Sequence, residues 1–305
     1  METDNRAKHA YLILAHHNFE QLAMLLETLD FPDNDIFIHI DKKSAFDPAM
    51  LTSAVKYSRV FFTDRVVVNW GGYSVVDATL LVLEAAVNHG PYVRYHLLTG
   101  IDLPLRSQAF IHEYFDRAPD LEFISSAYPM ASDRREFWNR VRYYFPFQEC
   151  FSRTNLLGKV LRRSLMIAQW ILRIDRTRNT DRLFGVGSAY FSITDRFARH
   201  VLTQKEAIHR HFSCGLCVDE MFLQWVYLHW DNPNPLYASN RKDHPYIQEC
   251  YFDVCRAIDW TRGTPYTYTD EDFEMLMESG CLFARKFDYK TSPELVKRIM
   301  EIAKG

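Results

Sequence analysis

The sequence has no apolar run that approaches the roughly 20 residues needed to cross a bilayer. Its first ten residues, METDNRAKHA, also lack the basic start, apolar core and small-residue cleavage site of a secretory signal. These two absences predict a cytoplasmic protein. In that compartment the cysteines are expected to be reduced thiols rather than disulfides.

Cysteine is scarce, with only six residues in a chain of 305. Cys214 and Cys217 form a C-x-x-C pair, and Cys250 and Cys255 are the nearest candidates to complete a zinc site. The spacing of the second pair differs from that of common zinc modules. We therefore predict no metal site at the cysteines, and a zinc-dependent module remains an alternative.

The chain also lacks a strong charge of either sign, repeats and low-complexity tracts. A formal net charge of -3 gives no general attraction to nucleic acid, so an anionic ligand must be held by a few local cations. The content of 48% hydrophobic and 25% charged residues is that of an ordinary globular protein. No linker marks a boundary, and we expect a single domain over residues 1–305.

A βαβ unit is predicted at the start of the chain. Residues 11–15 (YLILA) and 36–40 (IFIHI) are short apolar runs typical of buried strands, and residues 19–29 have the apolar spacing of one helical face. The strands end at His16 and at Asp41. Nucleotides bind beyond the carboxyl ends of strands in such sheets, so these residues are candidates for a nucleotide site.

Alternating strands and helices are predicted as far as residue 125. Strands are expected at residues 60–62, 66–68 and 95–98, and a helix at 74–87. This alternation indicates an α/β fold with a mostly parallel central sheet flanked by helices. We expect residues 8–125 to form the nucleotide-binding half.

The remaining half, residues 126–305, has a less regular pattern. A strand is predicted at 188–194 and a helix at 218–229, with Asp219 and Glu220 in its first turn. The segment LFARKFD, which contains Lys286, is predicted to be irregular, and Ser292 and Pro293 start a closing helix.

Residues 153–182 combine many Arg and Lys residues with apolar residues at helical spacing. A basic amphipathic helix can lie on an anionic membrane surface. It can equally be a helical insertion that packs its apolar side on the main domain, and we favour this second interpretation.

Two Asp-x-Asp triplets occur, and neither is placed as a metal site requires. In many nucleotide-binding enzymes such a triplet, at the carboxyl end of a strand, holds the divalent ion that neutralises a diphosphate. Residues 33–35 precede their strand, and residues 270–272 begin a helix in which Asp272 stands at capping-box distance from Thr269. Without a metal, a diphosphate can be neutralised by Arg and Lys. Candidate cations in the last fifth of the chain are Arg256, Arg262, Arg285 and Lys286.

Eight segments in order along the chain resemble the family of core-2/I-branching β-1,6-N-acetylglucosaminyltransferases and peptide O-xylosyltransferases (glycosyltransferase family 14). The IDWTRG and FARKFD forms are more similar to the xylosyltransferase branch. The segments are AYLILAHH (10–17), FIHIDKKS (37–44), VNWGGYSVVDA (68–78), YHLLTGIDLPL (95–105), GSAYFSIT (187–194), VDEMFLQWV (218–226), RAIDW (256–260) and FARKFD (283–288).

This resemblance implies a GT-A type fold and an inverting transfer from a UDP-sugar that needs no metal and no other cofactor. It implies Glu220 as the catalytic base and Arg256 and Lys286 as the cations that bind the diphosphate. The remaining residues implied to lie at the donor are Ala15, His16, Asp41, Trp70, Gly71 and Asp102.

The acceptor side is less similar to the animal enzymes. A loose similarity suggests Glu136, Trp138, Arg142 and Asp219 as acceptor contacts. We expect a glycan or glycolipid acceptor, no nucleic acid partner, and a cytoplasmic location with possible contact of residues 153–182 with the inner face of the membrane. GlcNAc is the expected sugar. Xylose or another UDP-linked hexose is the alternative, and a catalytically silent nucleotide-binding scaffold is an alternative of another class.

Overall fold

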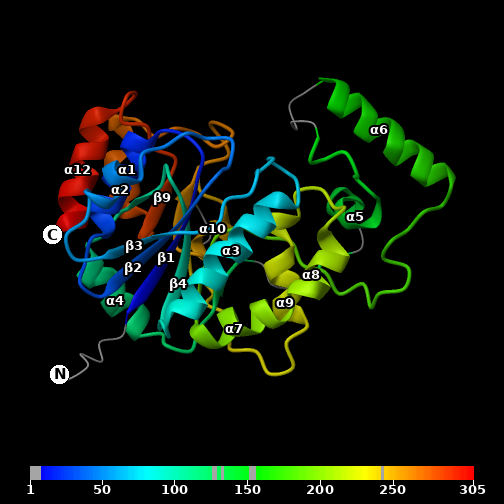
Figure 1. Ribbon diagram of the computed structural model, residues 1–305, viewed down its shortest axis with the longest axis horizontal. Helices are drawn as coiled ribbons and strands as arrows, with labels where there is room; N and C mark the ends of the chain where they lie inside the picture. Colours follow the sequence, from blue (N-terminus) through cyan, green and yellow to red (C-terminus); the bar gives the residue numbers. More distant parts are fainter. Residues whose placement is uncertain (1–7, 126–128, 132–133, 151–155, 242–243) are drawn as a thin grey trace.

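The computed structural model describes residues 8–125, 129–131, 134–150, 156–241 and 244–305. Its centre is a six-stranded sheet with the order β3-β2-β1-β4-β7-β6 (Figure 1). The first four strands are parallel to one another, and β7 runs antiparallel to both of its neighbours. The predicted mostly parallel sheet is confirmed. The strands are β1 (His9–Ala15), β2 (Asn34–Ile40), β3 (Arg59–Phe62), β4 (Arg94–Thr99), β6 (Phe123–Ile124) and β7 (Phe191–Ile193).

Helices cover both faces of this sheet. Alternate side chains of each strand point to opposite faces, and both faces are apolar and must be buried. Ala10 and Leu12 of β1 belong to one apolar core, and Tyr11 and Ile13 belong to the other. The first core is closed by α3 (Ser74–His89), α7 (Asp195–Thr203), α8 (Lys205–Phe212) and α9 (Phe222–Leu228). The second is closed by α1 (Phe19–Leu29), α2 (Pro48–Thr52), α4 (Gln108–Asp116), α11 (Phe273–Glu278) and α12 (Pro293–Lys304).

A small second sheet joins distant parts of the chain in the order β5-β9-β8. It contains β5 (Leu103–Pro104), β8 (Arg256–Ile258) and β9 (Phe283–Arg285). The predicted irregular conformation of the LFARKFD segment is therefore wrong for its first half, because β9 pairs with β5 on one side and with β8 on the other. This pairing sets the place of Arg285 and Lys286 in the molecule.

The predicted strand at residues 66–68 is absent, although the segment does run beside β2. The amide of Val66 donates to the His39 side chain (3.0 Å), and the amide of Val68 donates to the Asp41 carboxylate (3.4 Å). Side chains of β2 and its following loop thus take the donors that a strand ladder would use. The strand predicted at residues 188–194 is also shorter in the structure, where β7 spans only Phe191–Ile193.

The predicted helix at 218–229 is broken in its first turn. Residues Val218–Glu220 form a 3₁₀ turn (η1), and α9 begins after Met221, whose φ of -135° is not helical. The Glu220 carbonyl accepts a hydrogen bond from the amide of Gly187 at 2.9 Å, so it is used outside the helix. Glu220 therefore lies at the end of a separate turn, and not in the first turn of a helix as predicted. A second 3₁₀ turn, η2 (Asp270–Asp272), precedes α11 and carries the predicted capping box.

The predicted helical insertion contains α6 (Leu156–Ile171), which lies apart from the sheet beside α5 (Arg135–Arg142) in Figure 1. Residues 153–155 of the insertion lie outside the described residues. Only Gly158 and Gln169 of α6 are buried, while Leu156, Leu157, Val160, Ile167, Trp170 and Ile171 are exposed. The expectation that this helix packs its apolar side on the main domain holds for Leu161 and Leu165, which are half-buried, but not for these exposed residues. Within the described ranges, no helix is both long and apolar enough to cross a membrane. The remaining helix is α10 (Glu249–Phe252).

Candidate functional site

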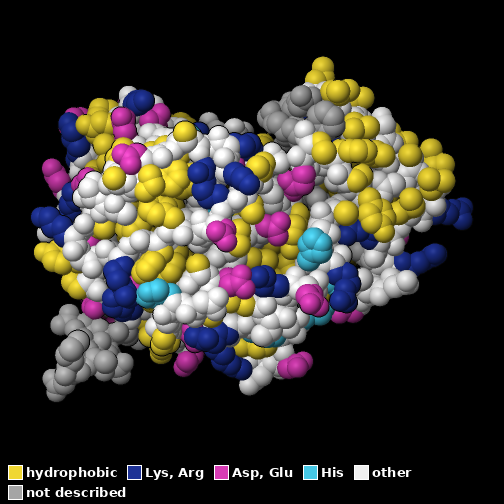
Figure 2. All heavy atoms as spheres, in the orientation of Figure 1, with side chains coloured by type: hydrophobic (Ala, Val, Ile, Leu, Met, Phe, Trp, Pro, Cys, Tyr) yellow, Lys and Arg dark blue, Asp and Glu magenta, His cyan; other side chains and the backbone are white. Residues whose placement is uncertain are grey.

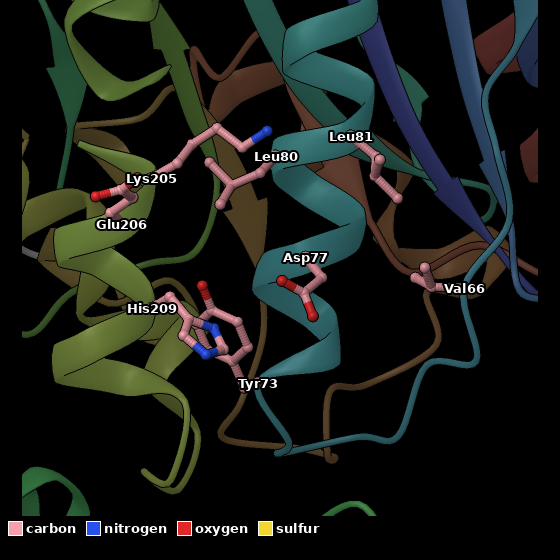
Figure 3. Close-up of a pocket in the computed structure, with 8 residues that line it drawn as sticks. All are labelled: Val66, Tyr73, Asp77, Leu80, Leu81, Lys205, Glu206 and His209. Carbon is pink, nitrogen blue, oxygen red and sulfur yellow. The ribbon is translucent and has the colours of Figure 1, made fainter. Parts of the chain in front are cut away.

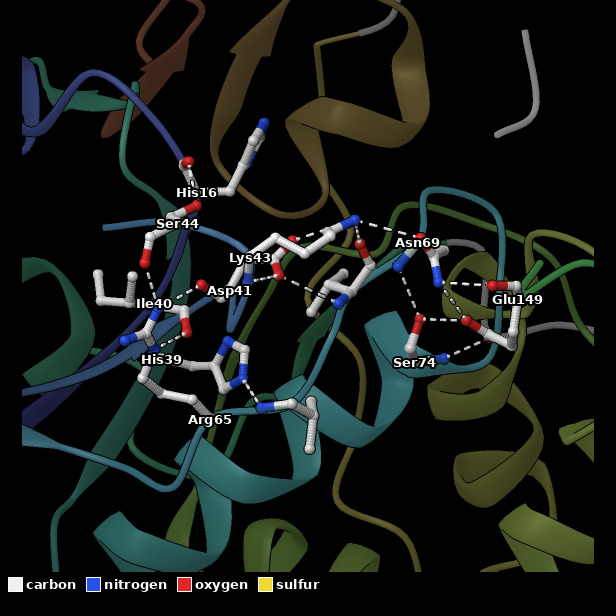
Figure 4. A network of polar contacts seen from close by, with 12 residues as sticks. His16, His39, Ile40, Asp41, Lys43, Ser44, Arg65, Asn69, Ser74 and Glu149 are labelled. Carbon is white, nitrogen blue, oxygen red and sulfur yellow. Dashed lines mark hydrogen bonds and ion pairs between the residues drawn. The ribbon is translucent and has the colours of Figure 1, made fainter. Parts of the chain in front are cut away.

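The carboxyl ends of β1 and β2 lie side by side, as the βαβ pattern predicts. The amide of Asp41 donates to the carbonyl of Ala15 (2.9 Å), and the Ser44 hydroxyl donates to the carbonyl of His16 (2.5 Å). Ala15 is buried, whereas the His16 side chain is exposed and points away from the loop that Asp41 holds (Figure 4). The structure therefore brings Ala15, His16 and Asp41 together at one edge of the sheet.

Asp41 organises the loop that follows β2. Its carboxylate accepts the amide of Lys43 (2.9 Å) and lies 3.5 Å from the Lys43 ammonium. That ammonium also donates to the carbonyl of Val68 (2.7 Å) and to the side chain of Asn69 (3.2 Å), as Figure 4 shows. Lys43 is half exposed, so it adds a positive charge to this edge that the sequence did not single out.

The turn formed by Trp70, Gly71 and Gly72 closes one side of the same edge. Trp70 is 54% exposed, and Gly71 has a φ of +83°, a conformation that favours glycine. A side chain at Gly72 would overlap Glu149, because an ideal Cβ there lies 2.2 Å from its carboxylate. Glu149 accepts the amide and the hydroxyl of Ser74 at 2.9 and 2.7 Å, and so binds the start of α3 (Figure 4).

Arg285, at the end of β9, supplies a half-buried positive charge to the site. Its guanidinium donates to the Tyr190 hydroxyl. Burial alone would lower the pKa of Arg285, but nearby Tyr190 and Asp102 raise it above its ordinary value. Arg285 is therefore charged at neutral pH. Burial raises the pKa of Tyr190 to about 12, which keeps this hydroxyl protonated.

Asp102 lies below the surface of the site. It is 1% exposed, and it accepts the amide and the hydroxyl of Thr99 at 2.8 and 2.6 Å. Burial raises the pKa of Asp102, and Arg285 opposes that effect. The resemblance implied a donor contact for Asp102, and in the structure this buried carboxylate holds the turn after β4 and is electrostatically coupled to Arg285.

His16 and His17, at the end of β1, are affected electrostatically by Arg285, Lys286 and Lys43. Burial lowers the pKa of both imidazoles, and His17 acts on His16 in the same direction. Arg285 lowers both pKa values further, Lys286 contributes at His17, and Lys43 contributes at His16. The three cations act electrostatically on the two rings, and Asp41 and Asp288 oppose them at His16 and His17 respectively, so this edge of the sheet is a positive region that carries charges of both signs with the cations in excess.

The structure does not place Arg256 at this surface, in contrast to its implied role. Arg256 is 1% exposed, and its guanidinium donates to the carbonyls of Phe191 (3.0 Å) and Leu97 (3.3 Å), to the Ser192 hydroxyl (3.1 Å) and to the carbonyl of Val254. Burial lowers its pKa to about 10, so it remains charged at neutral pH. A diphosphate cannot reach it in this conformation, because protein groups surround it.

Arg256 is therefore expected to stabilise the fold. Replacing it with Met leaves several buried carbonyls without a donor, at a cost of about 1–3 kcal/mol for each such group before the gain from apolar packing. We expect Arg256→Met to lower the free energy of unfolding in urea by about 3 kcal/mol. The exposed Arg298→Met is the control and should change it by less than about 0.5 kcal/mol. Unchanged stability with lost UDP binding would contradict this assignment.

The fourth candidate cation, Arg262, is also committed to the protein. It donates to Asp259 and, at 2.7 Å, to Asp272 of the capping box. Of the four candidate cations, Arg285 and Lys286 are the two that lower the pKa of a histidine at the end of β1.

Glu220 is partly open to solvent and is paired with a residue that the sequence did not single out. Its carboxylate lies 2.5 Å from the Arg140 guanidinium of α5, and its side chain is 37% exposed. The pKa of Tyr251 is raised by burial, then by Cys250 and by Glu220, and Tyr251 in turn raises the pKa of Arg285. Tyr251 is therefore electrostatically coupled to both Glu220 and Arg285.

The Trp70 turn also adjoins the turn that carries Glu220. The carbonyl of Gly71 accepts the amide of Cys217 at 2.8 Å, directly before η1. This contact links the turn beside the predicted donor residues to the predicted catalytic acid.

The predicted acceptor residues are divided between different places. Asp219 is partly exposed in η1, next to Glu220, and Glu136 is exposed on α5. Trp138 packs against Phe184 and donates to the carbonyl of Ala131 at 3.0 Å. Arg142 points to the α6 side, 3.3 Å from Asp175. The structure thus brings Asp219 to Glu220, while Trp138 and Arg142 make other contacts.

Residues of both Asp-x-Asp triplets have structural partners, although β2 begins at Asn34, so Asn34 and Asp35 lie within the strand that they were predicted to precede. Asp35 is buried in β2 and binds Arg59 and Tyr92, and Asp272 binds Thr269 and Arg262. In the described part of the chain, no group of three or more His, Cys, Asp and Glu side chains is arranged to hold a metal ion. The six cysteines are free thiols.

Two cavities lie away from the end of β1. One, of about 460 Å³, opens between α3 and α8 and is lined by Tyr73, Asp77 and His209 among others (Figure 3). None of the predicted site residues lines it. The other, of about 590 Å³, lies below α6 and includes Arg142.

A mostly parallel α/β sheet with cations at its carboxyl edge is typical of nucleotide-binding proteins. Residues 9–277 match the family model described as Core-2/I-Branching enzyme, and the chain belongs to this family of glycosyltransferases, whose fold is of the GT-A type. The family resemblance stated from the sequence is confirmed.

Similar proteins fall into two groups. The chain is 26% identical over 303 residues to a mouse N-acetyllactosaminide β-1,6-N-acetylglucosaminyl-transferase, covering 94% of this chain and 70% of the mouse protein. It is 25% identical over 305 residues to a human β-1,3-galactosyl-O-glycosyl-glycoprotein β-1,6-N-acetylglucosaminyltransferase, covering 92% and 65%. Rat xylosyltransferase 2 is 21% identical over 301 residues, which cover 94% of this chain and 33% of the rat protein.

Proposed function

We propose that this glycosyltransferase moves GlcNAc from UDP-GlcNAc to a hydroxyl of a glycan or glycolipid acceptor, with inversion and without a divalent metal. The observation that supports this proposal best is the hydrogen bond from the Cys217 amide to the Gly71 carbonyl at 2.8 Å, which joins the turn at the predicted donor residues to the turn that carries Glu220. A single displacement requires such an arrangement, with a base for the acceptor on one side and a cation for the leaving group on the other.

In the proposed reaction the Glu220 carboxylate takes the proton of the acceptor hydroxyl. The acceptor oxygen attacks the anomeric carbon from the face opposite UDP, and the bond from that carbon to the phosphate oxygen breaks. The electron pair leaves with UDP. Arg140, paired with Glu220 at 2.5 Å, holds the carboxylate in one orientation.

Arg285 and Lys286 stabilise the negative charge that develops on the departing diphosphate. This proposal keeps the Lys286 assignment and replaces Arg256 by Arg285, because Arg256 is enclosed by protein groups. Lys43 and the two neutral histidines complete the positive region. Ala15, His16 and Asp41 form the floor of the uridine site, and Trp70 and Gly71 form its side.

Xylose is the second candidate sugar, because the family relatives include xylosyltransferases. The test is a screen of UDP-GlcNAc, UDP-xylose, UDP-glucose and UDP-galactose that measures UDP release by slow hydrolysis without acceptor. Fastest release from UDP-GlcNAc is expected. Fastest release from UDP-xylose would replace the donor assignment, and UDP binding with no release from any donor would favour a silent scaffold.

Metal removal is expected to leave activity in place. Since cationic side chains neutralise the diphosphate in this proposal, EDTA should not reduce the rate of UDP release with the preferred donor. The measurement compares chelated protein with and without added Mn²⁺ or Mg²⁺. Loss of activity on chelation and its recovery with manganese would show that the reaction depends on a metal.

A further inference from the structure

The helix α6 turns an apolar face to solvent. Positions 156, 160, 167 and 171 lie on one side of a helix because they are separated by about one or two helical turns. The side chains there are Leu156, Val160, Ile167 and Ile171, and each is exposed. Trp170 adjoins them and is 68% exposed. These five residues are called the α6 stripe below. Figure 2 shows hydrophobic side chains over α6, with Lys and Arg side chains at the adjacent rim.

The opposite face of α6 is the one that contacts the protein. Gly158 and Gln169 are its buried residues, and the Gln169 amide binds the backbone of Tyr144 on both sides, at 2.8 and 2.9 Å. A helix in an ordinary globular domain buries its apolar side and exposes its polar side. In α6 the half-buried Leu161 and Leu165 lie on the protein side, and the α6 stripe is a second apolar surface that faces solvent. An exposed apolar surface of this kind indicates a partner other than the sheet domain.

An arginine-rich cavity lies at the end of the α6 stripe. It has a volume of about 590 Å³ and is lined by Trp170 and Ile171 of α6, by Arg142, Arg173, Arg178 and Arg182, and by Asp175. Asp175 lies 3.3 Å from both Arg142 and Arg182, so one carboxylate faces four guanidinium groups. The cavity has an excess of positive charge beside an exposed apolar surface.

We propose that the α6 stripe and the arginine-rich cavity together dock on an anionic lipid bilayer. The stripe inserts among the acyl chains at the interface, and the cavity binds phosphate groups of the lipid heads. Charge decides between a bilayer and a second copy of this chain. A second copy would bring the same four arginines towards one another, whereas phosphate headgroups complement them in charge and in geometry.

The docking surface is connected to the donor side of the active site. Arg162 of α6 contacts the side chain of Gln148 at 3.5 Å, and Gln148 donates to the carbonyl of Trp70 at 3.4 Å. The neighbouring Glu149 binds Ser74 at the start of α3. A bilayer bound at α6 therefore lies next to the turn that closes the proposed donor site.

Cosedimentation with lipid vesicles tests this inference. The experiment does not measure sugar transfer, so a negative result would leave the proposed function unaffected. The protein should bind vesicles of phosphatidylcholine and phosphatidylglycerol at low salt, at least tenfold more tightly than vesicles of phosphatidylcholine alone. Binding to the anionic vesicles should weaken as salt is added.

Two variants separate the two parts of the surface. Ile167→Ser with Trp170→Ser should weaken binding at least tenfold by removing the apolar anchor. Arg173→Gln, Arg178→Gln and Arg182→Gln together should weaken it as strongly and remove most of its salt dependence. The control removes three exposed arginines elsewhere, with Arg117→Gln, Arg210→Gln and Arg298→Gln, and should bind like the unmodified chain. Thermal unfolding of each variant establishes that it is folded.

Absence of binding to anionic vesicles at low salt would overturn the inference. So would equal loss of binding in the control variant, which would indicate attraction by total charge alone. Sedimentation velocity measures whether the protein is a monomer or a dimer, and so tests a second copy of the chain as the partner. A dimer that dissociates on Trp170→Ser substitution, together with a lack of vesicle binding, would identify a second copy of the chain as the partner.

Discussion

Glu220→Gln is expected to lower kcat by about 10²-fold or more, the usual loss when a general base is removed. The amide has nearly the same shape as the carboxylate and can still accept from Arg140, 2.5 Å away, so the turn should keep its position. The amide cannot take the proton of the acceptor hydroxyl. UDP affinity should remain close to normal, because the positive region around His16 and His17 is unchanged.

The measurement combines steady-state kinetics of the preferred donor and acceptor with calorimetric titration of UDP. Glu301→Gln, an exposed substitution on α12, is the matched control and should have no effect on either. Turnover of Glu220→Gln within a few-fold of normal would remove Glu220 from the mechanism. Asp219, its partly exposed neighbour, would then be the next candidate for the base.

Lys286→Ala is expected to lower kcat/KM for the donor by about 10²-fold, the scale found when one group that stabilises a developing negative charge is removed. Unlike Glu220→Gln, this change should also weaken UDP binding, because in the proposed reaction the Lys286 ammonium binds the diphosphate, which the product UDP retains. Arg285 remains as the second cation, held by Tyr190 beneath the site, so some activity should persist.

The control for this variant is Lys290→Ala, four residues further along and exposed. It removes one positive charge from the surface, as Lys286→Ala does, but this charge does not act on His17. Lys286→Arg should recover part of the lost activity, since the positive charge returns with a different shape. Full activity of Lys286→Ala would show that the diphosphate is neutralised elsewhere, with Lys43 as the candidate at the other side of His16.

Much of the nucleotide-binding half could be predicted from the sequence because local patterns control it. The helix predicted at residues 19–29 has the same bounds in the structure, and the strands around it differ only at their ends. Residues 66–68 have the composition of a strand and are not one, because His39 and Asp41 take their amide donors. Those bonds join segments more than 20 residues apart, and no local pattern reveals them.

The cations of the site show the same division. Four candidate cations could be named from the sequence, but the sequence does not show which of them are buried in the folded protein. Arg256 and Lys286 have similar surroundings in the sequence, each next to a short apolar run. Pairing of β8 with β9 buries Arg256 under the sheet and brings Arg285 and Lys286 to the end of β1. Arg140 was missed for a related reason, since nothing in the repeated arginines of α5 indicates which one faces Glu220.

The sequence alone determined the family, the parallel sheet and the positions of the residues at its strand ends, because these depend on motifs and on the periodicity of apolar side chains. Only the tertiary structure decided which cation is buried, which acid has an arginine partner, and that α6 directs an apolar stripe outwards. Amphipathic spacing gives a helix one apolar face. Contacts made by distant segments determine whether that face meets the core or the solvent.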